Sequence, residues 1–197
     1  MLLMLIITCV NYWGLGAGIL WDVAHGLGYA AFICLLYTCF SKPAKLNISS
    51  HRSLGYMALL FTSLHVLVLL ITDPITIEYL MPNAPLYMWL GSFSTILMVC
   101  IIVSSLTRFK NLSYSNSTSF KRVHRIMSWL IIAGSLYHIV DSGFYIYQQW
   151  QIIAIVLVAI LSLWSIPIKR LAPINSYQVT IQLMTFMAIF IGFWRWS

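Results

Sequence analysis

Long apolar segments separated by short polar loops make up the pattern of the chain. The segments are about 17–25 residues long, so that each can cross the ~30 Å hydrocarbon core of a bilayer as a helix. We therefore predict an all-α protein, a polytopic transmembrane helix bundle with six to seven spans. The predicted spans are 1–17, 21–40, 51–71, 86–106, 122–146, 151–168 and 176–195, the first of them short and interrupted by glycines.

These spans are expected to form one transmembrane domain over residues 1–197, with a core at 21–168 and an additional C-terminal span at 176–195. The composition agrees, because 61% of the residues are hydrophobic and only 8% are charged. A soluble domain carries about 25% charged residues and could not bury this much apolar surface. An integral membrane protein is therefore expected.

The charges predict an orientation. Ten of the eleven Lys and Arg residues lie in the loops 41–52, 107–125 and 169–170, whereas all four acidic residues lie at the opposite ends of the spans. The positive-inside rule places the three basic loops in the cytoplasm, as in a multi-pass protein of the cell inner membrane. The net charge of +7 then follows from topology and attraction to membrane lipid, and it requires no nucleic-acid partner.

Four of the five histidines form two pairs with equal spacing, His51 with His65 and His124 with His138. A separation of fourteen positions is about 21 Å and nearly four turns of a helix, so both histidines of a pair share one face. In the predicted topology both helices run outward. The inner histidines are then His51 and His124, and the outer histidines are His65 and His138.

Two parallel helices of this kind would place two imidazoles at each of two levels. That geometry suits two stacked haems, each ligated by two histidines, with His51 and His124 holding one iron and His65 and His138 the other. The sequence contains no CxxCH motif for covalent attachment, so that any haem would be of the b type. We therefore predict these four residues as the metal ligands of two haem b groups.

Small and cationic residues accompany the histidines. Gly55 and Gly134 lie four positions from His51 and His138 and would leave room for a flat macrocycle. Arg52, Arg122 and Arg125 lie beside the inner histidines, where they would either bind haem propionates or anchor the helix ends in the interface.

The fifth histidine, His25, lies in the predicted span 21–40. One interpretation is a hydrogen bond between neighbouring helices, which is common for polar side chains in membranes. The other is a contact to a haem propionate or a quinone. The sequence leaves both interpretations open.

The stretch from Trp21 to Trp150 resembles the ferric reductase-like transmembrane domain superfamily. The matching residues are the WD-x-x-x-x-LG start at Trp21, HRSLGYMALLFTSLH, the glycine-led GSFSTILMVCIIVSSL and FKRVHRIMSWLIIAGSLYH. The superfamily includes NADPH oxidases, ferric reductases and the haem-binding membrane subunit of the bacterial methionine sulfoxide reductase system. The resemblance implies the same ligand pairs, His51 with His124 and His65 with His138.

The sequence has no G-x-G-x-x-G fingerprint for a nicotinamide domain, so the chain is similar to the membrane-only members. We expect a di-haem b-type cytochrome that carries electrons across the membrane. The donor would be a cytoplasmic flavin or flavoprotein, or a quinol, and the acceptor on the outer side a periplasmic reductase, ferric iron or dioxygen. Such an oxidoreductase component would need a partner subunit, and bound FMN, FAD or quinone is an open alternative.

Two other functions are left open. One is a quinol-oxidising cytochrome b subunit of a respiratory complex. The other is a haem-binding sensor or assembly subunit without turnover, for which an absorbance change without steady-state electron flow would be diagnostic.

Overall fold

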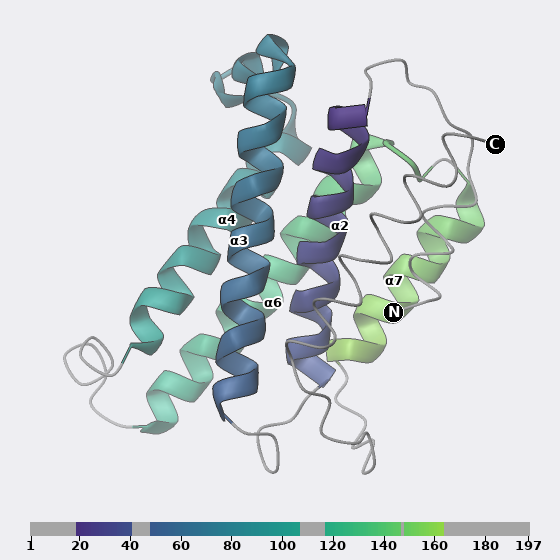
Figure 1. Ribbon diagram of the computed structural model, residues 1–197. Coiled ribbons are helices and arrows are strands. Elements are labelled where there is room, and N and C mark those ends of the chain that lie inside the picture. The colour runs from purple at the N-terminus through teal and green to yellow at the C-terminus, as the bar shows by residue number, and fades with distance from the viewer. Residues whose placement is uncertain (1–18, 41–47, 107–116, 147, 164–197) are drawn as a thin grey trace. The chain divides into compact units, whose positions relative to one another are not determined.

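The computed structural model describes residues 19–40, 48–106, 117–146 and 148–163. Within these ranges the chain forms helices and no strand, which confirms the all-α prediction for this part of the protein (Figure 1). The helices are α2 (Ile19–Phe40), α3 (Ile48–Thr72), the short 3-10 helix η1 (Pro74–Leu80), α4 (Leu86–Ser105), α6 (Ser117–Ser142) and α7 (Gln149–Leu163).

Four of these helices, α2, α3, α4 and α6, are long and apolar enough to cross a membrane. The chain is therefore a multi-pass membrane protein, and the predicted spans 21–40, 51–71, 86–106 and 122–146 are confirmed as helices. Helix α7 is shorter, with 15 residues, and the span predicted at 151–168 is described only to residue 163. The spans predicted at 1–17 and 176–195 lie outside the described residues, so that the total of six to seven spans stays a prediction.

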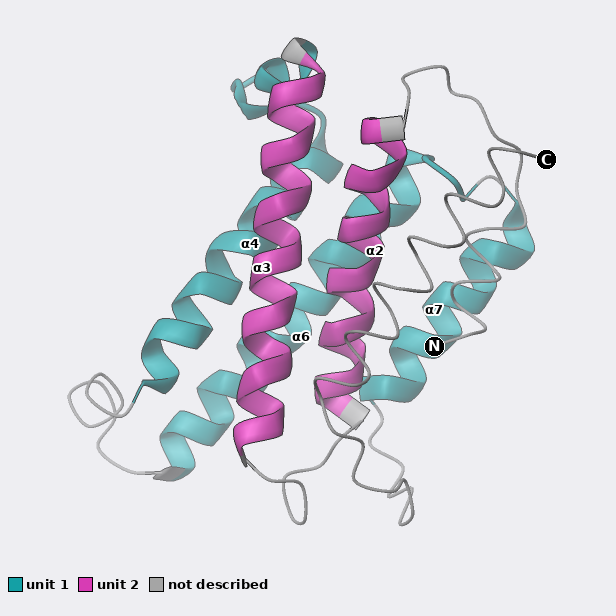
Figure 2. Cartoon of the chain, viewed as in Figure 1, with its two compact units in different colours: residues 1–12, 75–163 teal, residues 13–74, 164–197 magenta. Residues whose placement is uncertain are grey.

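The helices belong to two compact units, which Figure 2 shows in different colours. In the unit of residues 13–74 and 164–197, helix α2 packs along α3. In the unit of residues 1–12 and 75–163, helix α4 packs along α6, and α6 contacts α7. The prediction of one domain over 1–197 stays a prediction.

Regularly spaced buried residues explain why the long helices pack as they do. Buried positions on α3 include Leu54, Ala58 and Phe61, and those on α4 are Ser94, Met98 and Ile101. Both sets follow the i, i+4, i+7 spacing that places side chains on one helix face. Large apolar side chains at other positions, such as Leu67 on α3 and Ile96 on α4, are exposed, which suits a helix that faces lipid.

Helix α6 differs from the predicted span 122–146 at both ends. It begins at Ser117, because the polar residues that precede the apolar run continue the helix. It ends at Ser142 because Gly143 adopts a φ of +67°, the left-handed conformation that closes many helices. Hydrophobicity predicted the bilayer crossing, whereas the backbone conformation of Gly143 sets where the helix ends.

The connections between helices also contain ordered structure. The segment between α3 and α4 includes helix η1. Before α7, the Gln148 backbone N–H donates to the Gln151 side-chain carbonyl at 3.0 Å. This is half of a capping box, and it explains why α7 begins at Gln149.

Candidate functional site

The outer histidine of α3, His65, is fixed by the backbone of α2. Its Nδ1 lies 2.7 Å from the Ala24 carbonyl oxygen. A carbonyl oxygen only accepts hydrogen bonds, so Nδ1 must carry the proton and donate it. In the neutral ring the lone pair is then on Nε2, which is the nitrogen that could ligate a metal.

Gly28 lies one turn after Ala24 and touches the same ring. A Cβ atom built on Gly28 would lie 3.1 Å from Nδ1, 3.2 Å from Cε1 and 3.4 Å from Cγ of His65. The Nδ1 edge of the imidazole therefore rests against the α2 backbone, where a side chain would crowd it. Glycine permits this approach.

The outer histidine of α6, His138, is held in the same way within the other unit. Its Nδ1 lies 3.0 Å from the Tyr87 carbonyl oxygen of α4. Gly91 follows Tyr87 by one turn, and a Cβ there would lie 2.8 Å from Nδ1 and 2.9 Å from Cγ of His138. Each unit thus repeats a carbonyl, a glycine four residues later and a histidine on the antiparallel helix.

The inner histidines lie near the other ends of the same helices. His51 interacts with the Thr38 backbone of α2, and Thr38 follows Ala24 by the same fourteen residues that separate His51 from His65. The antiparallel register of α2 and α3 therefore repeats at both levels. On α6 the centroids of the His124 and Phe120 rings are 5.4 Å apart. The imidazoles of His51 and His124 are both half-buried.

The remaining histidine, His25, lies beside an outer histidine. Its ring makes an edge contact with the His65 ring, with 5.8 Å between the centroids. Its Nδ1 lies 2.9 Å from the Trp21 carbonyl oxygen of its own helix, and the Trp21 ring is 4.7 Å away. The structure thus places His25 next to a candidate ligand, and its contact to a propionate or quinone stays a prediction.

The two glycines predicted to leave room for haem have different surroundings. A methyl group on Gly55 would meet no atom of the described residues within 4 Å, which is compatible with open space beside α3. Gly134 is buried, and a Cβ there would collide with the Ser94 hydroxyl and lie 3.2 Å from the Leu90 carbonyl oxygen. Gly134 therefore lets α6 approach α4 closely, and haem clearance at this position stays a prediction.

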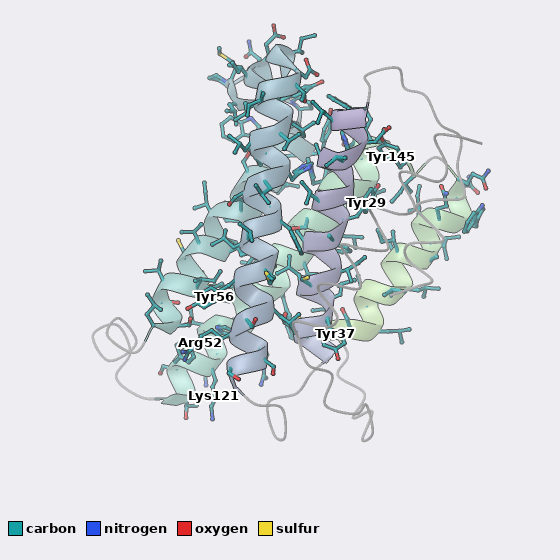
Figure 3. All side chains as sticks on the ribbon, in the orientation of Figure 1. Tyr29, Tyr37, Arg52, Tyr56, Lys121 and Tyr145 are labelled. Atoms are coloured by element: carbon teal, nitrogen blue, oxygen red, sulfur yellow. The ribbon has the colours of Figure 1, made fainter. Side chains whose placement is uncertain are left out.

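The predicted arginines are exposed and lie near the N-terminal ends of their helices. Arg52 lies on α3, and Arg122 and Arg125 lie on α6. Figure 3 labels Arg52 on α3 and, on α6, Lys121, which precedes Arg122 in the sequence. Both predicted roles, propionate binding and interfacial anchoring, are compatible with this exposure.

The predicted ligand pairs join residues of different units, since His51 and His65 lie on α3 and His124 and His138 on α6. Their pairing therefore stays a prediction. Within the described ranges, no cluster of three or more His, Cys, Asp or Glu side chains forms a site for a metal ion.

Sequence reasoning gave Gly28 and Gly91 no role, although both lie in the stretches that carry the family resemblance. A single glycine inside an apolar helix is a signal of close packing. Which residue packs against such a glycine depends on the register between the two helices. The spacing of apolar residues does not determine that register.

A family model described as "Ferric reductase like transmembrane component" matches residues 38–135. The match includes His51, His65 and His124 and ends three residues before His138. No curated protein and no solved structure matches the chain.

Proposed function

We propose that the chain is a membrane electron-transfer component, a di-haem b-type cytochrome, because residues 38–135 match the family model described as a ferric reductase like transmembrane component. In this proposal His51 and His124 bind one haem, and His65 and His138 bind the other. Electrons pass from a cytoplasmic flavin, a flavoprotein or a quinol to an acceptor on the outer side of the membrane. The acceptor is a periplasmic reductase, ferric iron or dioxygen.

The observation that carries the proposal is the hydrogen bond from each outer histidine to a backbone carbonyl. The Nδ1–H groups of His65 and His138 donate to Ala24 and Tyr87. Metal-bound histidines usually donate their second ring N–H to a carbonyl or carboxylate, which fixes the tautomer and orients the ring. Both imidazoles are therefore prepared to offer Nε2 to an iron.

The continuous helices set the distance between the two levels. Helix α3 contains both His51 and His65, and α6 contains both His124 and His138. The rise along each helix therefore separates its two histidines by about 21 Å. Bound haem would supply a one-electron carrier at each level.

Apolar residues occupy the helix positions between the levels. Ala58 lies midway between His51 and His65 and is fully buried, and Ile131 lies midway between His124 and His138 and is 2% exposed. Such side chains exclude water and lower the local dielectric constant, which is one of the factors that set a haem potential.

Cations at the beginnings of α3 and α6 support binding and orientation. Arg52, Arg122 and Arg125 are exposed and can pair with the carboxylates of haem propionates, or with an acidic surface on a donor protein. Their side chains have the positive charge that the positive-inside rule assigns to the cytoplasmic face. This supports electron entry at the level of the inner histidines.

The test is a reduced-minus-oxidised absorbance spectrum of the purified protein with haem quantified per chain. We expect two b-type haems in the wild type and one in His65→Ala. The matched control is Leu67→Ala, which changes an exposed residue on the same helix and should keep both haems. A folded wild-type protein without haem would refute the proposed function.

A further inference from the structure

Two glycines hold the outer histidines by the same arrangement of backbone atoms. We propose that Gly28 and Gly91 are positioning residues. Each lets a helix backbone approach the imidazole closely enough to accept its Nδ1–H, and this contact fixes the ring and strengthens Nε2 as an iron ligand. The effect on iron rests on the proposed function, whereas the effect on the ring does not.

The two units give the same geometry independently. In each unit the accepting carbonyl lies four residues before the glycine, as Ala24 does before Gly28 and Tyr87 before Gly91. The hydrogen bonds are 2.7 Å and 3.0 Å long. In both units the nearest ring atoms are Nδ1, Cγ and Cε1, so that the contact involves the Nδ1 edge and not Nε2.

The distances show why a side chain would disturb this arrangement. A Cβ on Gly91 would lie 2.8 Å from Nδ1 of His138, closer than non-bonded heavy atoms normally come. The ring would have to move away, and its 3.0 Å hydrogen bond to Tyr87 would lengthen or break. At Gly28 the closest approach is 3.1 Å, so His65 would need to yield only slightly. Gly91→Ala should therefore have the larger effect.

Contact with a histidine ring is not a general property of the glycines in these helices. Gly134 contacts a hydroxyl and a backbone carbonyl of α4, and Gly55 has open space around its Cα within the described residues. Gly28 and Gly91 instead contact a histidine ring whose Nδ1 donates to the same helix. The glycine and the accepting carbonyl thus act together on the imidazole.

The expected consequence for an iron ligand follows from the hydrogen bond. An imidazole that donates through Nδ1 is a more basic ligand, and loss of such a partner weakens metal binding by about 10–100-fold. A more basic ligand favours the ferric state. Loss of the hydrogen bond should therefore weaken haem retention at the outer level and make the midpoint potential of that haem more positive.

The experiment compares wild-type full-length protein with Gly28→Ala and Gly91→Ala. Haem per chain, a redox titration and the low-temperature EPR spectrum of the ferric protein are measured for each. We expect Gly91→Ala to lose one haem about 10–100-fold more readily, with a more positive potential and altered EPR signal for that haem only. Gly28→Ala should change in the same direction by less. Val99→Ala, an exposed change on α4, should match the wild type.

The outcomes separate this inference from the proposed function. If the wild type holds two haems and both glycine variants keep their potentials and EPR signals, the positioning role is wrong and the cytochrome stands. If Gly91→Ala does not fold, Gly28→Ala decides the question.

If the wild type holds no haem, the proposed function fails, and ¹⁵N NMR of histidine-labelled full-length protein tests the positioning role directly. We then expect His65 and His138, as well as His25, to be neutral rings protonated at Nδ1, and the ring of His138 should change in Gly91→Ala. Wild-type protein in which neither His65 nor His138 is protonated at Nδ1 would overturn the inference.

Discussion

The substitution Gly134→Ala tests whether this glycine is there for helix packing or for haem. The added methyl group would collide with the Ser94 hydroxyl and lie 3.2 Å from the Leu90 carbonyl oxygen. The hydroxyl can yield only by giving up its 2.8 Å hydrogen bond to Leu90. Overpacking of a well-packed site lowers the free energy of unfolding by about 1–3 kcal/mol. The higher helix propensity of alanine offsets about 1 kcal/mol of this loss. We expect a net loss of about 1 kcal/mol.

The double variant Ser94→Ala/Gly134→Ala separates the two interpretations. Removal of the hydroxyl eliminates the closer collision, so that Gly134→Ala should become neutral or slightly stabilising in this background. Ser94→Ala alone should be nearly neutral, because its hydroxyl bonds only within its own helix turn. The double-mutant cycle should therefore give a coupling free energy of about 1 kcal/mol.

The assay is the free energy of unfolding of the purified protein in an SDS titration, with haem per chain measured in parallel. A coupling free energy of zero between Ser94 and Gly134 would refute the packing argument. Loss of haem in Gly134→Ala that Ser94→Ala does not restore would instead favour haem clearance at this position.

Three further predictions concern other parts of the molecule. Gln151→Ala should lower the free energy of unfolding by about 1 kcal/mol in an SDS titration, because Gln148 loses its capping acceptor; an unchanged free energy of unfolding would exclude this cap. His138→Ala should reduce haem from two to one per chain in the absorbance assay, and two remaining haems would exclude this ligand. In a cysteine-free background, Asn83→Cys should react with an impermeant maleimide on intact cells and Lys121→Cys only after permeabilisation; the reverse would invert the topology.

Much of the fold was predictable because the bilayer imposes a strong rule on sequence. Four predicted spans are helices in the structure, since a segment in lipid must satisfy its backbone hydrogen bonds internally. The ends were less predictable. The α6 end at Ser142 depends on the left-handed backbone of Gly143, and the apolar residues that follow gave no sign of it.

The histidines of the candidate site could be predicted from the sequence, but the groups that position them could not. The spacing of His51 and His65 is visible in the sequence because a helix has a fixed rise and turn. The acceptors of the outer histidines are backbone carbonyls of α2 and α4, which every residue possesses. Only the antiparallel register identifies Ala24 and Tyr87, and that register arises from packing between helices.

The use of main-chain acceptors for His65 and His138 has a consequence for how this protein tolerates mutation. A side-chain acceptor disappears with one codon change, whereas the carbonyl at position 24 or 87 persists through almost any substitution. Selection can therefore act little on the identity of those two residues through this contact. It should act instead on the histidines and on Gly28 and Gly91, so that related chains are expected to keep the glycines.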